Sequence, residues 1–179
     1  RLMFALAILT GARMQTICTI RGQTIDEAIF DEENNRYIIH VGSHGDLVDT
    51  KGSKRLSVVI PAKLFELLKQ HWNCTESINR RLKSFYGNNM KNYLFLNKKC
   101  EPYVTSKSEK IDQRDPNVNR RVGIEGGVAR DVKTRNGQAI WAFINNVLLP
   151  RIRVSHPEFK SFSFHDLRAT FGMNLLETL

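Results

Sequence analysis

The chain has 179 residues, of which 41% are hydrophobic, enough for the core of one large domain or two small ones. Its longest apolar run, residues 2–9, is too short to cross a bilayer and lacks the basic start and cleavage site of a signal peptide. We therefore expect a soluble, cytoplasmic protein. The three cysteines are widely spaced and include no CxxC pair, which argues against a disulfide or zinc framework.

The net charge of +9 is concentrated in one stretch of the chain. Residues 80–135 contain 14 Lys or Arg and 6 Asp or Glu, a balance of +8, whereas the rest contains 13 and 12, a balance of +1. A concentrated basic surface is typical of a protein that binds a polyanion, most often nucleic acid. A well-solvated loop region can have the same composition, so both interpretations stay open at this point.

Two helices are predicted at the N-terminus. Residues 2–9 are apolar on all sides and predict a buried helix, and residues 12–21 predict a second helix that Thr10 can cap. Arg13 would then lie in the first turn of the second helix. A cation there opposes the helix dipole unless an anion is near.

Short runs rich in β-branched residues follow, over residues 28–30, 36–41 and 56–60, with polar turns between them. This pattern predicts a small antiparallel sheet. The longer turn, over residues 42–53, leads into Thr50-Lys51-Gly52-Ser53-Lys54-Arg55. A lysine beside a glycine at a hairpin tip is usually only an exposed charge.

Further helices are predicted over residues 61–71, 75–85 and 134–152. Residues 93–96 predict a strand or a buried extended segment, and the polar, basic residues 103–127 predict a loop or a weak helix. The predicted fold class is therefore α+β, mainly α-helical with a small three-stranded antiparallel sheet, in a single domain over residues 1–179.

The last predicted helix carries the most distinctive polar pair. Ser163 and Asp166 have the spacing of a capping box, which predicts that the helix begins at Phe164. His165 and Arg168 then lie on one face, near free N–H groups that favour an anion. The neighbouring apolar stripe consists of Phe164, Leu167, Phe171 and Leu175. An imidazole, a fixed cation and a helix N-terminus at one place predict a phosphate site.

Metal and cofactor sites are not expected. His40 and His44 are four residues apart on a strand and a turn rather than on a helix, and no second pair of ligands accompanies His71 and Cys74. The chain has no Gly-x-Ser-x-Gly segment that would suggest a nucleophilic serine.

Three segments, taken together and in this order, resemble the tyrosine recombinase and phage integrase family. Residues 9–13 (Leu-Thr-Gly-Ala-Arg) look like the family's Thr-Gly-x-Arg segment, and residues 50–55 (Thr-Lys-Gly-Ser-Lys-Arg) look like its lysine-bearing β-hairpin. Residues 164–171 (Phe-His-Asp-Leu-Arg-Ala-Thr-Phe) are similar to its His-x-x-Arg box, the most specific of the three. The resemblance covers nearly the whole chain and implies the helical catalytic-domain fold of that family.

The resemblance also implies a mechanism and a set of catalytic residues. Arg13 and Arg168 would hold the non-bridging oxygens of a scissile phosphate in double-stranded DNA, and Lys51, preferred over Lys54, would protonate the leaving 5′ oxygen. His165 would transfer a proton at the nucleophile or hold a phosphate oxygen. A tyrosine would form a 3′-phosphotyrosine link for strand rejoining, without metal or cofactor, and the full-length protein would self-associate on DNA.

The chain departs from the family pattern at two places. Thr16 stands where the family usually has an acidic residue, three positions after the first arginine. The four tyrosines all precede the His-x-x-Arg box, so none matches the family's nucleophile, and we expect a partial catalytic domain that binds DNA weakly without cleaving it. Two alternatives are a non-catalytic DNA-binding relative and a metal-independent RNA phosphodiesterase that uses His165 and Lys51.

Overall fold

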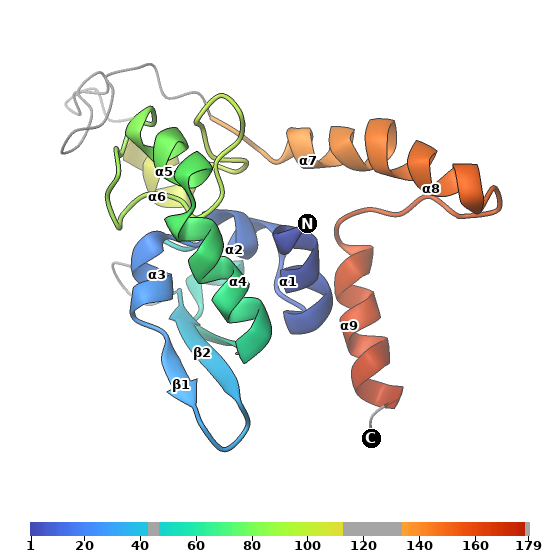
Figure 1. Ribbon diagram of the computed structural model, residues 1–179, viewed down its shortest axis with the longest axis horizontal. Helices are drawn as coiled ribbons and strands as arrows, with labels where there is room; N and C mark the ends of the chain where they lie inside the picture. Colours follow the sequence, from blue (N-terminus) through green and yellow to red (C-terminus); the bar gives the residue numbers. More distant parts are fainter. Residues whose placement is uncertain (43–46, 113–133, 178–179) are drawn as a thin grey trace.

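The computed structural model describes residues 1–42, 47–112 and 134–177, in which helices pack against a small sheet at the edge of the molecule (Figure 1). The helices of the first part are α1 (Leu2–Thr10), α2 (Met14–Thr19), α3 (Gly22–Asp26), α4 (Ala62–Asn73), α5 (Thr75–Leu82) and α6 (Lys107–Asp112). The helices of the second part are α7 (Gln138–Phe143), the π-helical turn η2 (Ile144–Leu148), α8 (Leu149–Ser155) and α9 (Asp166–Glu177). Among the described residues, no helix is both long and apolar enough to span a membrane.

The sheet has the three antiparallel strands that the sequence predicts. Its strands are β1 (Ile29–Asp31), β2 (Arg36–Val41) and β3 (Leu56–Pro61), hydrogen-bonded in the order β1-β2-β3. Ile39 pairs with Val58, and both side chains are buried, as are Val41 and Ile60. Alternate residues of β3 therefore face the core, which fixes the register of the strand that follows the Lys51 turn.

Helix α1 is the central element of the core. Its residues are apolar on all sides, and it contacts α2, β3, α4 and α9. Leu6 and Ala7 are fully buried, and the ring of Phe4 meets that of Phe164 edge to face, with centroids 5.3 Å apart. Leu9 is 46% exposed, so the prediction of a buried helix is only partly confirmed, but the apolar faces of α1 still bring elements from both ends of the chain together.

The second predicted helix is shorter than expected. α2 covers Met14–Thr19 instead of residues 12–21, and a separate short helix, α3, starts at Gly22, just beyond the predicted end. Arg13 is the N-cap residue of α2, with extended backbone angles (φ −73°, ψ 151°), so the prediction that it lies in the first turn is wrong. The opposition between its charge and the first turn of a helix is thereby reduced.

The helical segment before the C-terminal helix is displaced relative to its prediction over residues 134–152. It runs from Gln138 to Ser155 and extends away from the body of the molecule (Figure 1). Arg135 stays extended because its carbonyl accepts the N–H of Thr105 at 2.9 Å. Pro150, near the start of α8, has no N–H for the regular helical ladder, and the π turn lies just before it.

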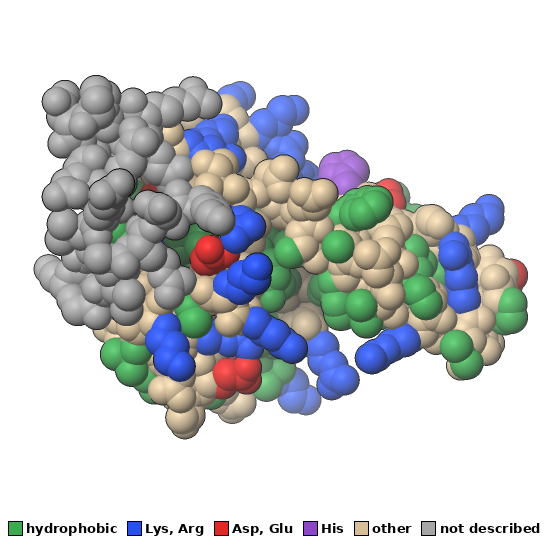
Figure 2. Space-filling view, turned by 90° about the horizontal axis from the view of Figure 1, so that it is seen from above, with side chains coloured by type: hydrophobic (Ala, Val, Ile, Leu, Met, Phe, Trp, Pro, Cys, Tyr) green, Lys and Arg blue, Asp and Glu red, His purple; other side chains and the backbone are tan. Residues whose placement is uncertain are grey.

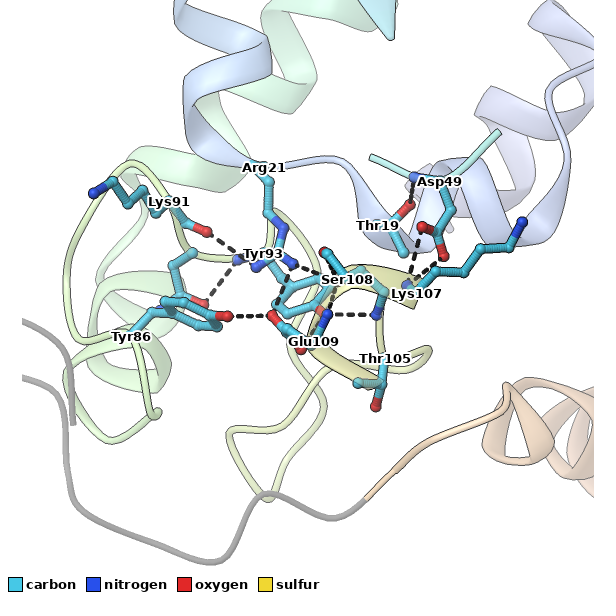
Figure 3. Close-up of polar contacts among 12 residues, drawn as sticks. Thr19, Arg21, Asp49, Tyr86, Lys91, Tyr93, Thr105, Lys107, Ser108 and Glu109 are labelled. Atoms are coloured by element: carbon cyan, nitrogen blue, oxygen red, sulfur yellow. Dashed lines mark hydrogen bonds and ion pairs between the residues drawn. The ribbon is translucent and has the colours of Figure 1, made fainter. Parts of the chain in front are cut away.

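A buried ionic cluster holds α6 on the body (Figure 3). Arg21, of which 2% is exposed, forms an ion pair with Glu109 at 2.8 Å, and its guanidinium lies 3.4 Å from the ring centroid of Tyr93. The hydroxyls of Tyr86 and Tyr93 also donate to Glu109. Because a buried charge needs a partner, these contacts make α6 a fixed part of the fold.

Helix α9 lies along α1 (Figure 1). The two helices approach each other closely at Gly11, against which the ring of Phe171 packs. Gly11 ends α1 in the left-handed conformation (φ 61°), and its N–H donates to the carbonyl of Ala7. A Cβ on Gly11 would lie 2.5 Å from the ring of Phe171. Of the predicted apolar stripe, Phe164 is buried but lies before α9, Leu167 is partly buried against the core, and Leu175 is 52% exposed, so the prediction is wrong for Leu175.

Replacing Gly11 by alanine should destabilise the protein. Alanine in the left-handed backbone conformation costs about 1–2 kcal/mol, and the ring of Phe171 must move as well. We therefore expect the free energy of unfolding, measured in urea, to fall by about 2 kcal/mol or more. Gly172→Ala is the matched control, because a Cβ at Gly172 in α9 meets no atom within 4 Å. Alanine is also the better helix former, so this variant should be at least as stable as the parent. Equal losses in both variants would contradict the assigned role of Gly11.

Candidate functional site

Five cations from three separate segments line one cavity. This cavity, of about 490 Å³, lies between the start of α2, the segment from Thr50 to Val58, and α9. Its cationic residues are Arg13, Lys51, Lys54, Arg55 and Arg168. We call it the lysine-side cavity. The sequence-predicted residues Arg13, Lys51 and Arg168 are therefore brought together, although the chain separates the first from the last by more than 150 positions.

A second cavity shares the two arginines and contains the predicted histidine. Arg13, Arg168 and His165 line it together with Trp141 and Gln15. We call it the histidine-side cavity. Arg13 and Arg168 thus lie between a part of the site that contains lysines and a part that contains His165, and Lys51 lines only the first.

The position of Arg13 depends on the residues just before it. Thr10 donates its hydroxyl to the carbonyl of Leu6 at 2.6 Å and accepts the N–H of Ala12 at 3.2 Å. With Gly11 in the left-handed conformation, this turn directs the chain from α1 into α2. The backbone of Arg13 is therefore held in place at the N-cap of α2. Its side chain is partly exposed and lines both cavities.

Lys51 begins a short 3₁₀ turn, η1 (Lys51–Ser53), rather than standing at the tip of a regular hairpin. The hydroxyl of Thr50 donates to the carbonyl of Lys54 at 2.6 Å, which closes the turn. Gly42 has a φ of 79°, and a Cβ there would lie 2.4 Å from the same carbonyl. The turn is thus held at its base, while the side chains of Lys51 and Lys54 are exposed.

His165 directly precedes α9, and Arg168 is in its first turn. The helix begins at Asp166, so the prediction that it begins at Phe164 is wrong by two residues. The cause is a turn in which Asp166 N–H donates to Ser163 O and Arg168 N–H to His165 O. His165 therefore does not lie on a face of the helix with Arg168, but both residues line the histidine-side cavity.

The five cations of the lysine-side cavity form no ion pair with any described carboxylate. By contrast, Arg80 pairs with Glu76, Arg135 pairs with Glu101, and Arg81 lies over the ring of Trp72. Like charges gathered without counter-charges repel one another, and a bound anion removes that repulsion. The arrangement is therefore suited to a phosphate or another compact anion.

The basic stretch over residues 80–135 is only partly a free surface. Three of its arginines, Arg80, Arg81 and Arg135, are used in the internal contacts just named, and residues 113–133 lie outside the described part of the chain. Figure 2 nevertheless shows many Lys and Arg side chains on one face, with few acidic ones among them. The positive charge at the two cavities does not come from residues 80–135. It comes from Arg13 at the start of α2, from the lysine turn η1 and the residues after it, and from Arg168 in α9.

None of the four tyrosines, all of which the structure describes, lines either cavity. Tyr86 and Tyr93 donate to Glu109, and burial raises the pKa of both hydroxyls. Tyr37 donates to Glu66 at 3.1 Å, and Tyr103 lies on a different cavity. No tyrosine of this chain is therefore placed to attack an anion held by Arg13 and Arg168.

Sequence reasoning missed two residues of the site. It gave no role to Arg55, which directly follows Lys54 and lines the lysine-side cavity. It also passed over Trp141, which is 59% exposed and lies at the histidine-side cavity. Ile140 and Ile144 form the inner face of α7 and η2, so helical periodicity alone places residue 141 on the outer face.

Asp166 makes the start of α9 sensitive to pH. Its carboxylate accepts the backbone N–H of Ser163 at 2.7 Å and the Ser163 hydroxyl at 3.0 Å, and both bonds lower the pKa of Asp166. A lowered folded pKa stabilises this turn above the unfolded value of about 3.9, and the effect is lost as pH falls through the folded pKa.

We therefore expect the amide signal of Ser163 to shift in an NMR titration below about pH 4 and to be insensitive to pH above it. Asp166→Asn should abolish that transition, because the amide does not titrate. A transition that persisted unchanged in Asp166→Asn would show that another group holds the turn.

Comparison of the chain with protein-family models, with curated proteins and with solved structures gives no match in any of the three. A function for this chain is therefore inferred from the residues that line the two cavities and from the resemblance of their segments to the tyrosine recombinase family.

Proposed function

We propose that the chain is a catalytic domain of the tyrosine-recombinase type, which binds double-stranded DNA at a scissile phosphate for site-specific recombination. The observation that carries the proposal is that Arg13, Lys51 and Arg168 line one cavity and that the two arginines meet His165 in the next. These are the residues for which the resemblance to that family implies a catalytic role. No metal or nucleotide cofactor is part of the proposal.

The two arginines would bind the phosphate itself. A guanidinium can donate to two phosphate oxygens at once and keeps its charge at every working pH. Two such groups, both of which line the two cavities, would stabilise the additional negative charge of a pentacoordinate phosphorus. Since neither Arg13 nor Arg168 is neutralised by a described carboxylate, both charges are available to the phosphate.

The division of Lys51 and His165 between the cavities agrees with in-line displacement. The attacking and leaving oxygens of such a reaction lie on opposite sides of phosphorus, so proton transfer is needed at two places. Lys51 would protonate the leaving 5′ oxygen, and His165 would act at the attacking oxygen or hold a non-bridging one. Exposure of Lys51 on a short turn lets its side chain adjust when DNA binds.

The attacking tyrosine of this proposal is not one of the four in this chain. Binding by these 179 residues and covalent cleavage are therefore separable properties. A non-catalytic DNA-binding role is the second candidate function, and the placement of all four tyrosines away from both cavities favours it for this chain taken alone. Self-association on DNA belongs to the same proposal.

Removing either arginine should weaken DNA binding. We expect Arg13→Ala and Arg168→Ala each to lose about tenfold or more in affinity and to lower the slope of log K against log salt by about one. Fluorescence anisotropy of a labelled duplex at several salt concentrations measures both quantities. Lys63→Ala, which removes an equal charge from an exposed position on α4, is the matched control and should change the affinity little. If all three variants behave alike, the cavities are not the phosphate site.

The chain should form no covalent adduct with DNA. Incubation with a nicked duplex that traps covalent intermediates, followed by denaturing electrophoresis, should show only free protein, because no tyrosine reaches the arginines. An adduct at Tyr37, Tyr86, Tyr93 or Tyr103 would contradict this placement. Cleavage of RNA that disappears with a 2′-deoxy substrate would instead support a phosphodiesterase that uses His165 and Lys51.

A further inference from the structure

Asp49 lies two residues before Lys51 and is bound to the helix that Arg13 caps (Figure 3). Its carboxylate accepts Gln15 Nε2 at 2.6 Å, its backbone N–H donates to Thr19 Oγ at 2.9 Å, and its carbonyl accepts Thr16 Oγ at 2.8 Å. All three partners are on α2. Side-chain and backbone groups of Asp49 are thus bound to the same short helix.

The same carboxylate also reaches the first residue of α6. Both of its oxygens lie 3.1 Å from the backbone N–H of Lys107. Asp49 is only 8% exposed and does not line either cavity, whereas its neighbour Thr50 lines the lysine-side cavity. Asp49 is therefore placed to hold the Lys51 turn without touching a ligand.

These contacts attach the backbone just before Lys51 to the helix that Arg13 caps. Arg13 caps α2, and Lys51 starts a turn whose base is attached to the side of α2. Thr16 stands where the tyrosine recombinase family usually has an acidic residue. Its hydroxyl donates a hydrogen bond to the carbonyl of Asp49.

We propose that Asp49 is a positioning residue, which holds the backbone of the Lys51 turn, from which the Lys51 side chain extends, in place relative to Arg13 by attaching the segment before the turn to α2 and α6. The expected effect of Asp49 on DNA binding rests on the proposed function. The attachment of Asp49 to α2 and α6 can be measured without DNA.

The direction in which DNA affinity changes when the Asp49 carboxylate is removed distinguishes a positioning role from a purely electrostatic one. A carboxylate near a cationic cavity repels a phosphate, so removal of its charge alone would strengthen DNA binding. If Asp49 positions Lys51, its removal weakens binding although the net positive charge rises by one. Opposite outcomes are therefore expected from the two roles.

The first test is the DNA affinity of Asp49→Asn, which keeps the shape of the side chain but presents an amide group to donors. We expect about tenfold weaker binding, the change that loss of one hydrogen bond to a charged group represents. Asp49→Glu keeps the charge and displaces it, and it should also weaken binding. Asp31→Asn is the matched control, because the Asp31 carboxylate binds Asn34 and Arg36 in the turn between β1 and β2. The DNA affinity of the Asp31→Asn variant should equal or exceed that of the parent.

A double variant shows whether Asp49 acts through Lys51. Lys51→Ala should bind DNA more weakly than the parent, and adding Asp49→Asn to it should cause no further loss, since the group being positioned is already gone. A full additional loss in the double variant would mean that Asp49 only supports the fold, and it would overturn the proposal.

Amide hydrogen exchange of the free protein tests the attachment independently. In Asp49→Asn, exchange over residues 47–51 should become faster, while exchange in β2 stays unchanged. Unchanged exchange over residues 47–51 would overturn the proposal whatever the DNA results are. If Arg13→Ala and Arg168→Ala keep the parent's affinity, the proposed function fails, and the exchange measurement still decides whether Asp49 holds the turn.

Discussion

The close packing of Phe171 against Gly11 is the contact on which the site depends. Gly11 is where α1 ends, Arg13 lies two residues later, and Phe171 is one turn of helix beyond Arg168. Only a residue without a side chain lets the ring approach this closely. This contact, together with that of Phe4 and Phe164, packs α9 on α1 and so brings the two arginines to the same place, and what stabilises the fold also assembles the site.

The protein uses its cations in two different ways. Arg21, Arg81 and Arg135 are bound inside the structure by a carboxylate, an aromatic ring or both, and they contribute to the fold. The cations of the lysine-side cavity have no such partners among the described residues. Keeping like charges together opposes folding, and such local conflicts are typical of functional sites. The absence of counter-charge, rather than the overall charge of the chain, marks the site.

Rigid and adaptable parts of the site come from different structures. Arg13 and Arg168 start from a helix cap and a first helical turn, both of which are held by packing against α1. Lys51 stands on a short exposed turn whose base is bound through Thr50 and, as we infer, through Asp49. Groups that bind a phosphate benefit from a fixed position, whereas a proton donor has to follow the leaving oxygen. The architecture separates these two requirements.

The sequence by itself determined the local structure and the candidate residues. Alternating β-branched residues predicted the three strands, apolar periodicity predicted most helices, and the spacing of His165 and Arg168 predicted a shared site, because such patterns depend only on neighbours along the chain. Tertiary structure alone decided that Arg13 is a cap residue, that Lys51 and His165 line different cavities, and that Asp49 binds α2. Each of these follows from contacts between segments far apart in the chain, such as Gly11 with Phe171, and local patterns carry no information about such distances.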